Sequence, residues 1–481
     1  MASVARPWWQ RAVLYQVYVR SFADSDSDGV GDLRGIVDRL EYLQWLGVDA
    51  LWLSPVTVSP DKDWGYDVAD YTDVQAAFGG MPALDELVAE AGARDLHVII
   101  DIVPNHTSDR HPWFQESRAS RNSPRRDWYV WADPKQDGSP PNNWRSTFLG
   151  APAWTLDDRT GQYYLHNFLP EQPDLNWWND DVRAAFDAIL RFWLDRGIDG
   201  FRIDVAHGIV KDRELRDNPD PSVSTYNANR EDVHDVLRRW RRLVDAYAPE
   251  RVLLGETWVM DLRRLAGFYG NGADELHLAF NFPFTFSELN AEQLRSIVET
   301  TESLLPHGAW PVWMLSNHDI ARFPTRMAGG DERKARALLF LLFTLRGTPV
   351  LYYGDELGMP QAEIPRGSER DMDGRDGART PLPWNGGWND PWLPLTARVA
   401  SVAEQRASEG SFLSYCRGLI AQRRANPDLV DGDYQSLPSP DGVWAFRRGE
   451  HTRVAVNLTD DDAEGDDGLR LAPWQGIVQR R

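Results

Sequence analysis

VLYQVYV (13–19), LRGIVDRLEYLQWLG (33–47) and DALWLSP (49–55) follow one another near the start of the chain. The first and third runs are short, apolar and rich in β-branched and aromatic residues, which is typical of buried strands. The middle run repeats apolar residues at helical spacing. A strand, a helix and a second strand in this order predict a parallel β–α–β unit, because parallel neighbours need a crossover connection.

The same alternation continues along the chain. Most of the later strand-like runs are also preceded by a helical pattern. The six later runs are HVIIDIVP (97–104), GFRIDVA (200–206), VLLGETW (252–258), HLAFNF (277–282), VWMLSN (312–317) and TPVLYYG (348–354). Eight strands in all is the number that closes a (β/α)8 barrel. An open doubly wound sheet is the alternative, but no GxGxxG or Walker sequence follows an early strand. We therefore predict an α/β fold based on a (β/α)8 TIM barrel.

Two segments depart from this rhythm. Residues 105–175 are rich in Trp, Pro, Asn and Asp and are too long for a structureless loop, so we expect a small domain inserted after strand 3. Near the end, GVWAFRRGEHTRVAVNLTD (442–460) alternates like antiparallel strands. The expected division is a barrel from 1–104 and 176–395, domain B from 105–175, and the last barrel helix with a C-terminal β-domain from 396–481.

Composition limits the partners. Hydrophobic residues make up 42% and charged residues 26%, as in ordinary globular proteins, and the net charge of −21 opposes nucleic acid binding. The single cysteine, Cys416, excludes an intramolecular disulfide. The longest apolar run, 337–345, is too short to span a bilayer, and the N-terminus lacks a signal-peptide core. We expect a cytoplasmic protein with a small-molecule partner and no membrane or nucleic acid partner. The oligomeric state is left open.

Polar and charged residues stand where several predicted strands end. In a barrel, the C-terminal ends of the strands face the active site. A single aspartate there is usually a helix cap, but acids on separate strands would converge on one rim. The residues at these ends are Asp101, Asn105 and His106 after strand 3, Arg202 and Asp204 in strand 4, Glu256 in strand 5, and Asn317, His318 and Asp319 after strand 7.

This set of acids points to glycoside hydrolysis. The chain has no GxSxG or HExxH sequence and no Cys/His pair, whereas two carboxylates are what glycosidases use. Arg202 lies two residues before Asp204, on the same face of the strand, and is expected to lower the pKa of Asp204. Glu256 would need a raised pKa to act as the acid.

A further acidic stretch, DSDSDGVGDLRG (24–35), follows the spacing of an EF-hand loop for its first nine positions. Position 12, where a bidentate glutamate should stand, is Gly35. These residues alone favour an acidic surface turn and a metal-binding loop equally. The role of the 22 tryptophans is also undecided from the sequence, since they could pack in the core or stack on sugars.

DIVPNH (101–106), GFRIDVAH (200–207), GETW (255–258) and SNHD (316–319) closely resemble the four motif blocks of the α-amylase family, family 13 of the glycoside hydrolases. QPDLN (172–176), WGYDVADY (64–71) and GRDGARTPLPW (374–384) resemble the oligo-1,6-glucosidase and α-glucosidase branch of that family. The resemblance runs from about residue 7 to about residue 425. It implies a catalytic barrel, an inserted domain and a C-terminal β-sandwich.

The resemblance also implies roles for individual residues. Asp204 would be the nucleophile of a retaining reaction, Glu256 the acid/base, and Asp319 the acid that stabilises the transition state. Asp101 would support Arg202. The expected substrate-binding residues are Arg202, His106 and His318 around the −1 sugar, Tyr66 beneath it, and Asp63 with Arg379 as the pair that grips the non-reducing end.

For the acidic loop, the resemblance implies a structural calcium site after strand 1, with magnesium as the alternative ion. Hard oxygen ligands at alternating positions suit either cation. No organic cofactor is expected. The implied ligands are Asp24, Asp26, Asp28, Asp32 and the carbonyl of Val30.

The function expected from the sequence is a retaining, exo-acting α-glucosidase acting on short α-glucosides of the maltose or isomaltose type. Val205 after the nucleophile accompanies α-1,6 activity in this branch, but His207 replaces the usual asparagine, so the linkage is left open. A transglucosylase or isomerase on the same scaffold is the alternative, although ARFPTRMAGGDERK (321–334) matches the arginine-rich isomerase loop poorly. A non-catalytic interaction subunit is a third reading, and the three retained acids argue against it.

Overall fold

An eight-stranded parallel sheet forms the centre of the computed structural model, which describes residues 6–395, 399–464 and 468–480. The strand order is β11-β10-β9-β5-β2-β1-β13-β12, and a parallel bridge between Phe280 and Val312 joins the two end strands. The predicted (β/α)8 barrel is therefore confirmed. Its strands are β1 (Leu14–Val17), β2 (Ala50–Leu53), β5 (His97–Ile102), β9 (Gly200–Ile203), β10 (Val252–Gly255), β11 (Leu278–Ala279), β12 (Val312–Met314) and β13 (Thr348–Tyr352).

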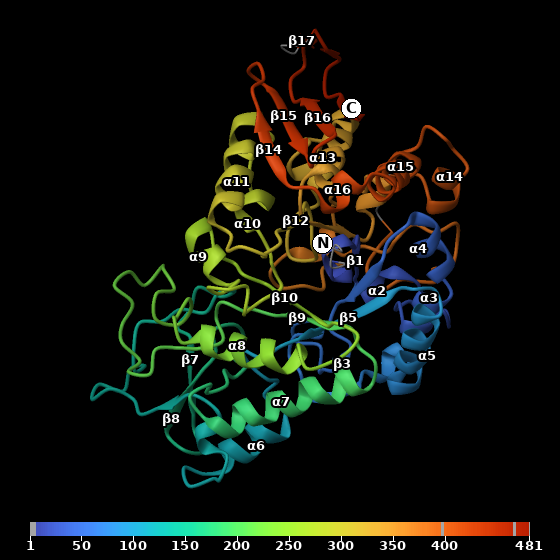
Figure 1. The fold of residues 1–481 in the computed structure, drawn as a ribbon. Helices are drawn as coiled ribbons and strands as arrows, with labels where there is room; N and C mark the ends of the chain where they lie inside the picture. Colours follow the sequence, from blue (N-terminus) through green and yellow to red (C-terminus); the bar gives the residue numbers. More distant parts are fainter. Residues whose placement is uncertain (1–5, 396–398, 465–467, 481) are drawn as a thin grey trace.

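Helices surround this barrel because each connection returns the chain to the same end of the sheet (Figure 1). Asn179 and Asn290 cap α7 and α11 by accepting backbone N–H groups of their first turns. The helices that alternate with the strands are α4 (Leu40–Leu46), α5 (Gly80–Gly92), α7 (Asp180–Asp195), α8 (Val233–Val244), α9 (Leu262–Gly267), α11 (Ala291–Leu304), α13 (Glu332–Thr344) and α15 (Phe412–Ala425). Within the described residues, no helix is long and apolar enough to cross a membrane.

The parallel register determines which side chains meet. Asp101 in β5 is paired with Arg202 in β9, and Arg202 is paired in turn with Leu254 in β10. Glu256 directly follows β10. Because all these strands run the same way, the residues at their C-terminal ends lie on one rim of the barrel.

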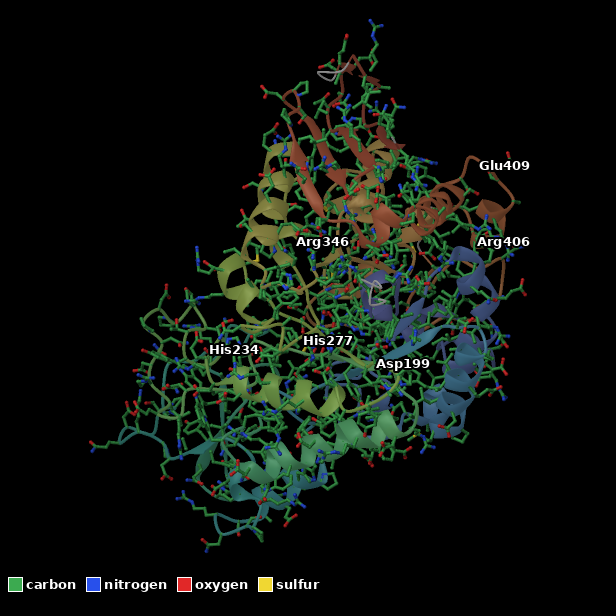
Figure 2. The ribbon with its side chains drawn as sticks, viewed as in Figure 1. Asp199, His234, His277, Arg346, Arg406 and Glu409 are labelled. Atoms are coloured by element: carbon green, nitrogen blue, oxygen red, sulfur yellow. The ribbon has the colours of Figure 1, made fainter. Side chains whose placement is uncertain are left out.

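The opposite rim carries structural ion pairs. Asp199, just before β9, accepts the backbone N–H of Val98 and lies 3.0 Å from the guanidinium of Arg251. The Nδ1 atom of His277 accepts the N–H of Leu253 at 3.0 Å. Figure 2 labels Asp199 and His277 near the middle of the molecule. These contacts link neighbouring strands at their N-terminal ends.

The segment after β5 forms a small antiparallel sheet in the order β6-β8-β7, from β6 (Trp131–Ala132), β7 (Trp154–Asp157) and β8 (Gln162–Leu165). Helix α6 (Pro112–Ala119) precedes this sheet. Trp144 and Trp154 stack in its core with ring centroids 6.0 Å apart. The boundaries drawn at 105 and 175 stay a prediction. Core packing is the role of the tryptophans that are fully buried, which are Trp52, Trp144, Trp177, Trp193, Trp240, Trp310, Trp313 and Trp444.

The C-terminal sheet is antiparallel in the order β14-β15-β16-β19, from β14 (Tyr434–Leu437), β15 (Val443–Arg448), β16 (Thr452–Asn457) and β19 (Gly476–Arg480). It covers α13, the helix that contains the longest apolar run, through contacts from β16 and β19, and Figure 1 shows α13 beside β16. A side chain at Gly476 would clash with the ring of Phe340 in α13. The expected domain boundary at 395 adjoins residues 396–398, which lie outside the described residues.

Candidate active site

A single buried guanidinium joins the acids of the rim. Arg202, which is 0% exposed, places Nη1 2.6 Å from Asp101 and 2.7 Å from Asp204. Its Nη2 atom lies 3.0 Å from Glu256. The structure therefore brings together carboxylates from three neighbouring strands, as the sequence predicted. Asp101 faces Arg202 and the Trp52 indole N–H, which fits the expected supporting role.

The electrostatics of Asp204 differ from the expectation. Burial raises the pKa of Asp204 well above its ordinary value, Arg202 opposes this rise, and the neighbouring carboxylates of Glu256 and Asp101 add to it. Arg202 does act to lower this pKa, as predicted, but its effect is smaller than that of burial, so the net pKa of Asp204 is raised. One guanidinium is shared by three buried acids, so it does not outweigh their burial and mutual repulsion.

Glu256 is held by the backbone of the residue after the nucleophile. The N–H of Val205 donates to Oε2 of Glu256 at 2.9 Å, the same oxygen that faces Arg202. Val205 has φ of 45°, a strained conformation for a β-branched residue. Oε1 of Glu256 makes no hydrogen bond to another described residue, and Glu256 lines the cavity described below.

Asp319 lies against two arginine side chains and the imidazole of His318. Burial alone would raise its pKa, but His318, Arg375 and Arg379 hold the pKa below the ordinary value of an aspartate. Oδ1 accepts hydrogen bonds from both arginines at 3.0 Å. Oδ2 lies 3.1 Å from Nε2 of His318, which also contacts the hydroxyl of Tyr66 at 2.6 Å. Asp319 is therefore held as a fixed anion.

The partner expected for Asp63 is corrected by the structure. Nη2 of Arg375, not a nitrogen of Arg379, lies 2.7 Å from Asp63. Arg379 is buried behind Asp319 and donates to the carbonyl of His318 at 2.8 Å. The two arginines lie one turn apart around the short helix η4 (Arg375–Ala378), so both reach Asp319 but only Arg375 reaches Asp63.

His106 completes this side of the site. Burial lowers its pKa to about 4, so the ring is neutral near pH 7. Nδ1 lies 2.9 Å from the side-chain amide of Asn105. Gln172, from the QPDLN motif, contacts both His106 and Asp63 through its amide nitrogen at 3.0 Å. Gln172 thus connects two predicted substrate-binding residues.

These side chains line a cavity of about 700 Å³, a size typical of small-molecule sites. Of the predicted residues, Asp63, Tyr66, His106, Asp204, Glu256 and Asp319 line it, whereas Arg202, His318 and Arg379 lie behind its wall. Sequence reasoning missed several further lining residues, namely Arg375, Phe148, Phe168, His207, Val223, Trp258 and Met260. Three of these residues had a signal, because Arg375, His207 and Trp258 belong to the motifs GRDGARTPLPW, GFRIDVAH and GETW that were already singled out.

The acidic loop brings together three of the predicted ligands. Carboxylate oxygens of Asp24, Asp26 and Asp28 all lie within 4.8 Å of one another. Asp32 is not in this group, since it caps α3 (Leu33–Val37) by accepting the N–H of Gly35 at 2.7 Å. Three hard oxygen donors at one exposed turn fit calcium or magnesium, since a cation would relieve their mutual repulsion.

A (β/α)8 barrel with carboxylates gathered at its C-terminal rim is an arrangement that fits a glycoside hydrolase. The family model for the α-amylase catalytic domain matches residues 16–432. The chain therefore belongs to the α-amylase family. It is 41% identical to a probable α-glucosidase of Rhizobium meliloti (strain 1021), with 98% of this chain and 93% of that protein covered. It is 35% identical to an oligo-1,6-glucosidase of Heyndrickxia coagulans, with 95% and 93% covered.

Solved structures agree with this assignment. The α-glucosyl transfer enzyme XgtA has a TM-score of 0.94 and 39% identity, covering 99% of this chain and 100% of that chain. The trehalulose synthase MutB from Pseudomonas mesoacidophila MX-45 has a TM-score of 0.91 and 32% identity at the same coverage. The chain thus resembles hydrolases, a glucosyl transfer enzyme and a synthase of one family.

Proposed function

We propose that this protein is a retaining, exo-acting α-glucosidase that releases terminal α-1,4- or α-1,6-linked glucose from short α-glucosides. The observation that carries the proposal is the arrangement around Arg202, where Asp204 and Glu256 contact the same guanidinium and face one cavity. Two carboxylates placed together in this way can divide the work of a two-step displacement.

In the first step, a carboxylate oxygen of Asp204 attacks the anomeric carbon while the bond from that carbon to the leaving oxygen breaks. Glu256 gives its proton to the leaving oxygen, and glucosyl-Asp204 forms. In the second step, the Glu256 carboxylate takes a proton from water, the water oxygen attacks the anomeric carbon, and Asp204 leaves as a carboxylate. Two inversions release α-glucose. Asp319, held as an anion, would stabilise the positive charge that develops on the sugar ring.

The ion pair of Asp63 and Arg375 supports exo action. Both side chains line the cavity, and Arg375 also lies 3.0 Å from Asp319. A charged pair beside the −1 position can hydrogen-bond the hydroxyls of a terminal glucose. Such bonds would favour a chain end over an internal residue.

The test is proton NMR of the protein with maltose, isomaltose and sucrose in separate tubes, followed from the first minutes. We expect the signal of α-glucose to appear before that of β-glucose with at least one of them. Initial release of β-glucose would contradict the retaining mechanism, and no turnover of any α-glucoside would contradict the proposed activity.

Arg375→Ala is expected to lower kcat/KM by about 100-fold or more, because charge-assisted hydrogen bonds contribute about 1.5–3 kcal/mol each and Asp63 loses its cationic partner. Initial rates on the preferred disaccharide measure the loss. Arg366→Ala is the matched control, because Arg366 is an exposed arginine nine residues earlier in the same segment. Equal activity of both variants would contradict a role for Arg375 in substrate binding.

The pKa of Asp204 gives a pH prediction. Asp204 must be ionised to attack, so kcat/KM should fall as the pH drops through the raised pKa of Asp204. The acidic limb of the profile should therefore lie above about pH 4, the ordinary range of an aspartate. Samples held at each pH and assayed at pH 7 separate this titration from irreversible unfolding. A limb at or below the ordinary aspartate value would contradict the prediction.

A transglucosylase or isomerase is the second candidate, and its support is the likeness to XgtA and MutB. The first step would be the same, and a sugar hydroxyl rather than water would then attack glucosyl-Asp204. In the NMR experiment, new oligosaccharide signals without free glucose would favour this candidate.

We also propose a structural calcium site at Asp24, Asp26 and Asp28, with Val30 and Asp32 as further expected ligands. A cation that binds only the folded state adds about 2.7 kcal/mol to the free energy of unfolding when its free concentration is about 100 times its Kd. We expect chelation to lower Tm and added calcium to restore it. Asp28→Ala should abolish the response, whereas a Tm that ignores chelation and calcium would contradict the site.

A further inference from the structure

Four buried side chains beside the catalytic cavity form one chain of hydrogen bonds. The amide nitrogen of Gln16, in β1, lies 2.8 Å from Nδ1 of His318. Nε2 of His318 lies 2.6 Å from the hydroxyl of Tyr66, and that hydroxyl lies 3.4 Å from Oδ2 of Asp101. Because a buried polar group that loses its partner costs free energy, the direction of each hydrogen bond matters.

The carboxylate at one end sets the direction of the chain. Burial raises the pKa of Asp101 to about 6, which leaves the carboxylate ionised near pH 7 and able only to accept. Hydrogen bonds to an ionised acceptor are the stronger ones, so the Tyr66 hydroxyl gives its one hydrogen to Asp101. The oxygen of Tyr66 is then left as an acceptor. Nη1 of Arg202 donates to it at 3.4 Å, which leaves one lone pair for His318.

The proton of His318 must then lie on Nε2. Burial lowers the pKa of His318 well below its ordinary value, so the ring is neutral near pH 7 and has one N–H group. Since the hydrogen of the Tyr66 hydroxyl is already used, Nε2 can only donate to that oxygen. Oδ2 of Asp319, 3.1 Å from Nε2, also favours an N–H there, because a bare nitrogen would place its lone pair beside a carboxylate.

Gln16 supplies the matching donor at the other ring nitrogen. With the proton of His318 on Nε2, Nδ1 is a bare acceptor, and the amide N–H of Gln16 fits it. Oε1 of Gln16 has no hydrogen-bond partner among the described residues. Packing alone would be served better by an apolar side chain, since an unpaired buried oxygen costs free energy. The amide is therefore used through its nitrogen.

The other end of the chain supports the reacting groups. Asp101 also accepts from Arg202, whose guanidinium contacts the other two acids of the rim. Tyr66 lines the cavity, and its ring stacks on that of His318 with centroids 5.3 Å apart and planes 4° apart. If the proton of His318 moved to Nδ1, Tyr66 would turn its hydrogen to Nε2 and leave Asp101. The surface that faces the glucose would then change.

We propose that Gln16 is a positioning residue for the glycosidase reaction, which keeps the proton of His318 on Nε2 and so holds the Tyr66 hydroxyl on Asp101. Gln16 does not line the cavity and acts only through His318. The proposal rests on the α-glucosidase function proposed above and goes beyond it, because it assigns a task to a residue of β1 that touches no substrate.

The place of the proton can be measured without any substrate. In protein labelled with nitrogen-15 histidine, the chemical shifts at pH 7 distinguish an N–H nitrogen from a bare one. The His318→Gln variant identifies the signals of His318 by their absence. We expect an N–H at Nε2 and a bare Nδ1, and a proton on Nδ1 would overturn the proposal. In Gln16→Met the two signals should move toward each other as the second tautomer becomes populated, whereas unchanged signals would overturn the role of Gln16.

Gln16→Met should also lower kcat/KM on the preferred disaccharide by about tenfold, the scale of one hydrogen bond lost from a buried network. Gln10→Met is the matched control, because Gln10 is a buried glutamine that precedes the same strand, at the opposite rim of the barrel. The control should keep both the activity and the His318 signals of the unaltered protein. Thermal unfolding of each variant shows whether the fold survives.

Full activity of a folded Gln16→Met variant would overturn this inference and leave the proposed function standing. Absence of turnover on every α-glucoside by the unaltered protein would overturn the proposed function. The nitrogen signals of His318 would still decide whether Gln16 sets the tautomer, because they need no turnover.

Discussion

Asp204→Asn is expected to lower kcat by about 10⁴-fold or more, the scale seen when a covalent nucleophile is removed. An amide at this position cannot form the glucosyl ester, and it no longer supplies a carboxylate to Arg202, which lies 2.7 Å from Asp204. Single-turnover and steady-state rates on the preferred disaccharide measure the loss. Thermal unfolding of the same sample shows whether the fold survives the change in a buried ion pair.

Asp199→Asn is the matched control for this variant. Asp199 precedes the same strand, β9, and also pairs with an arginine, but it lies at the opposite rim of the barrel. We expect its activity to stay within a few-fold of the unaltered protein. The Asp204→Gly variant adds a positive test, because azide can enter the space of the missing carboxylate and give β-glucosyl azide. An Asp204→Asn variant that keeps more than a tenth of the activity would contradict the assignment of the nucleophile.

Glu256→Ala is expected to lower kcat/KM by about 10²–10⁴-fold for disaccharides and alkyl glucosides, because their leaving oxygens need a proton. The loss should be much smaller for α-glucosyl fluoride, whose leaving group needs little protonation. Rates on these substrates give the measurement. Azide should react with glucosyl-Asp204 in this variant and form α-glucosyl azide, the opposite anomer to the product expected from Asp204→Gly. An equal loss on all substrates would contradict an acid role for Glu256.

The sequence predicted the barrel and much of its site because both follow from short-range patterns. Each strand and helix has its own periodicity, and the number of strands determines the closure. Once the strands are parallel, Asp204 and Glu256 must lie on the same rim, since each stands at or just after the C-terminal end of its strand. No long-range information is needed for that step.

The parts that could not be predicted depend on how loops fold over the rim. Arg375 and Arg379 belong to one motif, and only the turn of η4 decides which of them reaches Asp63. The net pKa shift of Asp204 depends on burial and on three neighbouring acids. These cannot be read from the spacing of Arg202 and Asp204 in the sequence. The exposure of Trp258 and Met260 likewise arises from the packing of Thr257 and Val259 beneath them.

The cover that the C-terminal sheet forms over α13 has a consequence for synthesis on the ribosome. Helix α13 ends at Thr344, and β16 and β19, which contact it, are translated roughly a hundred residues later. At about 5–20 residues per second, its apolar surface waits roughly 5 to 27 seconds for its cover. During that interval the nascent chain exposes an aggregation-prone helix. Chaperones that bind apolar segments during translation should therefore act on this protein late, after the barrel strands have been made.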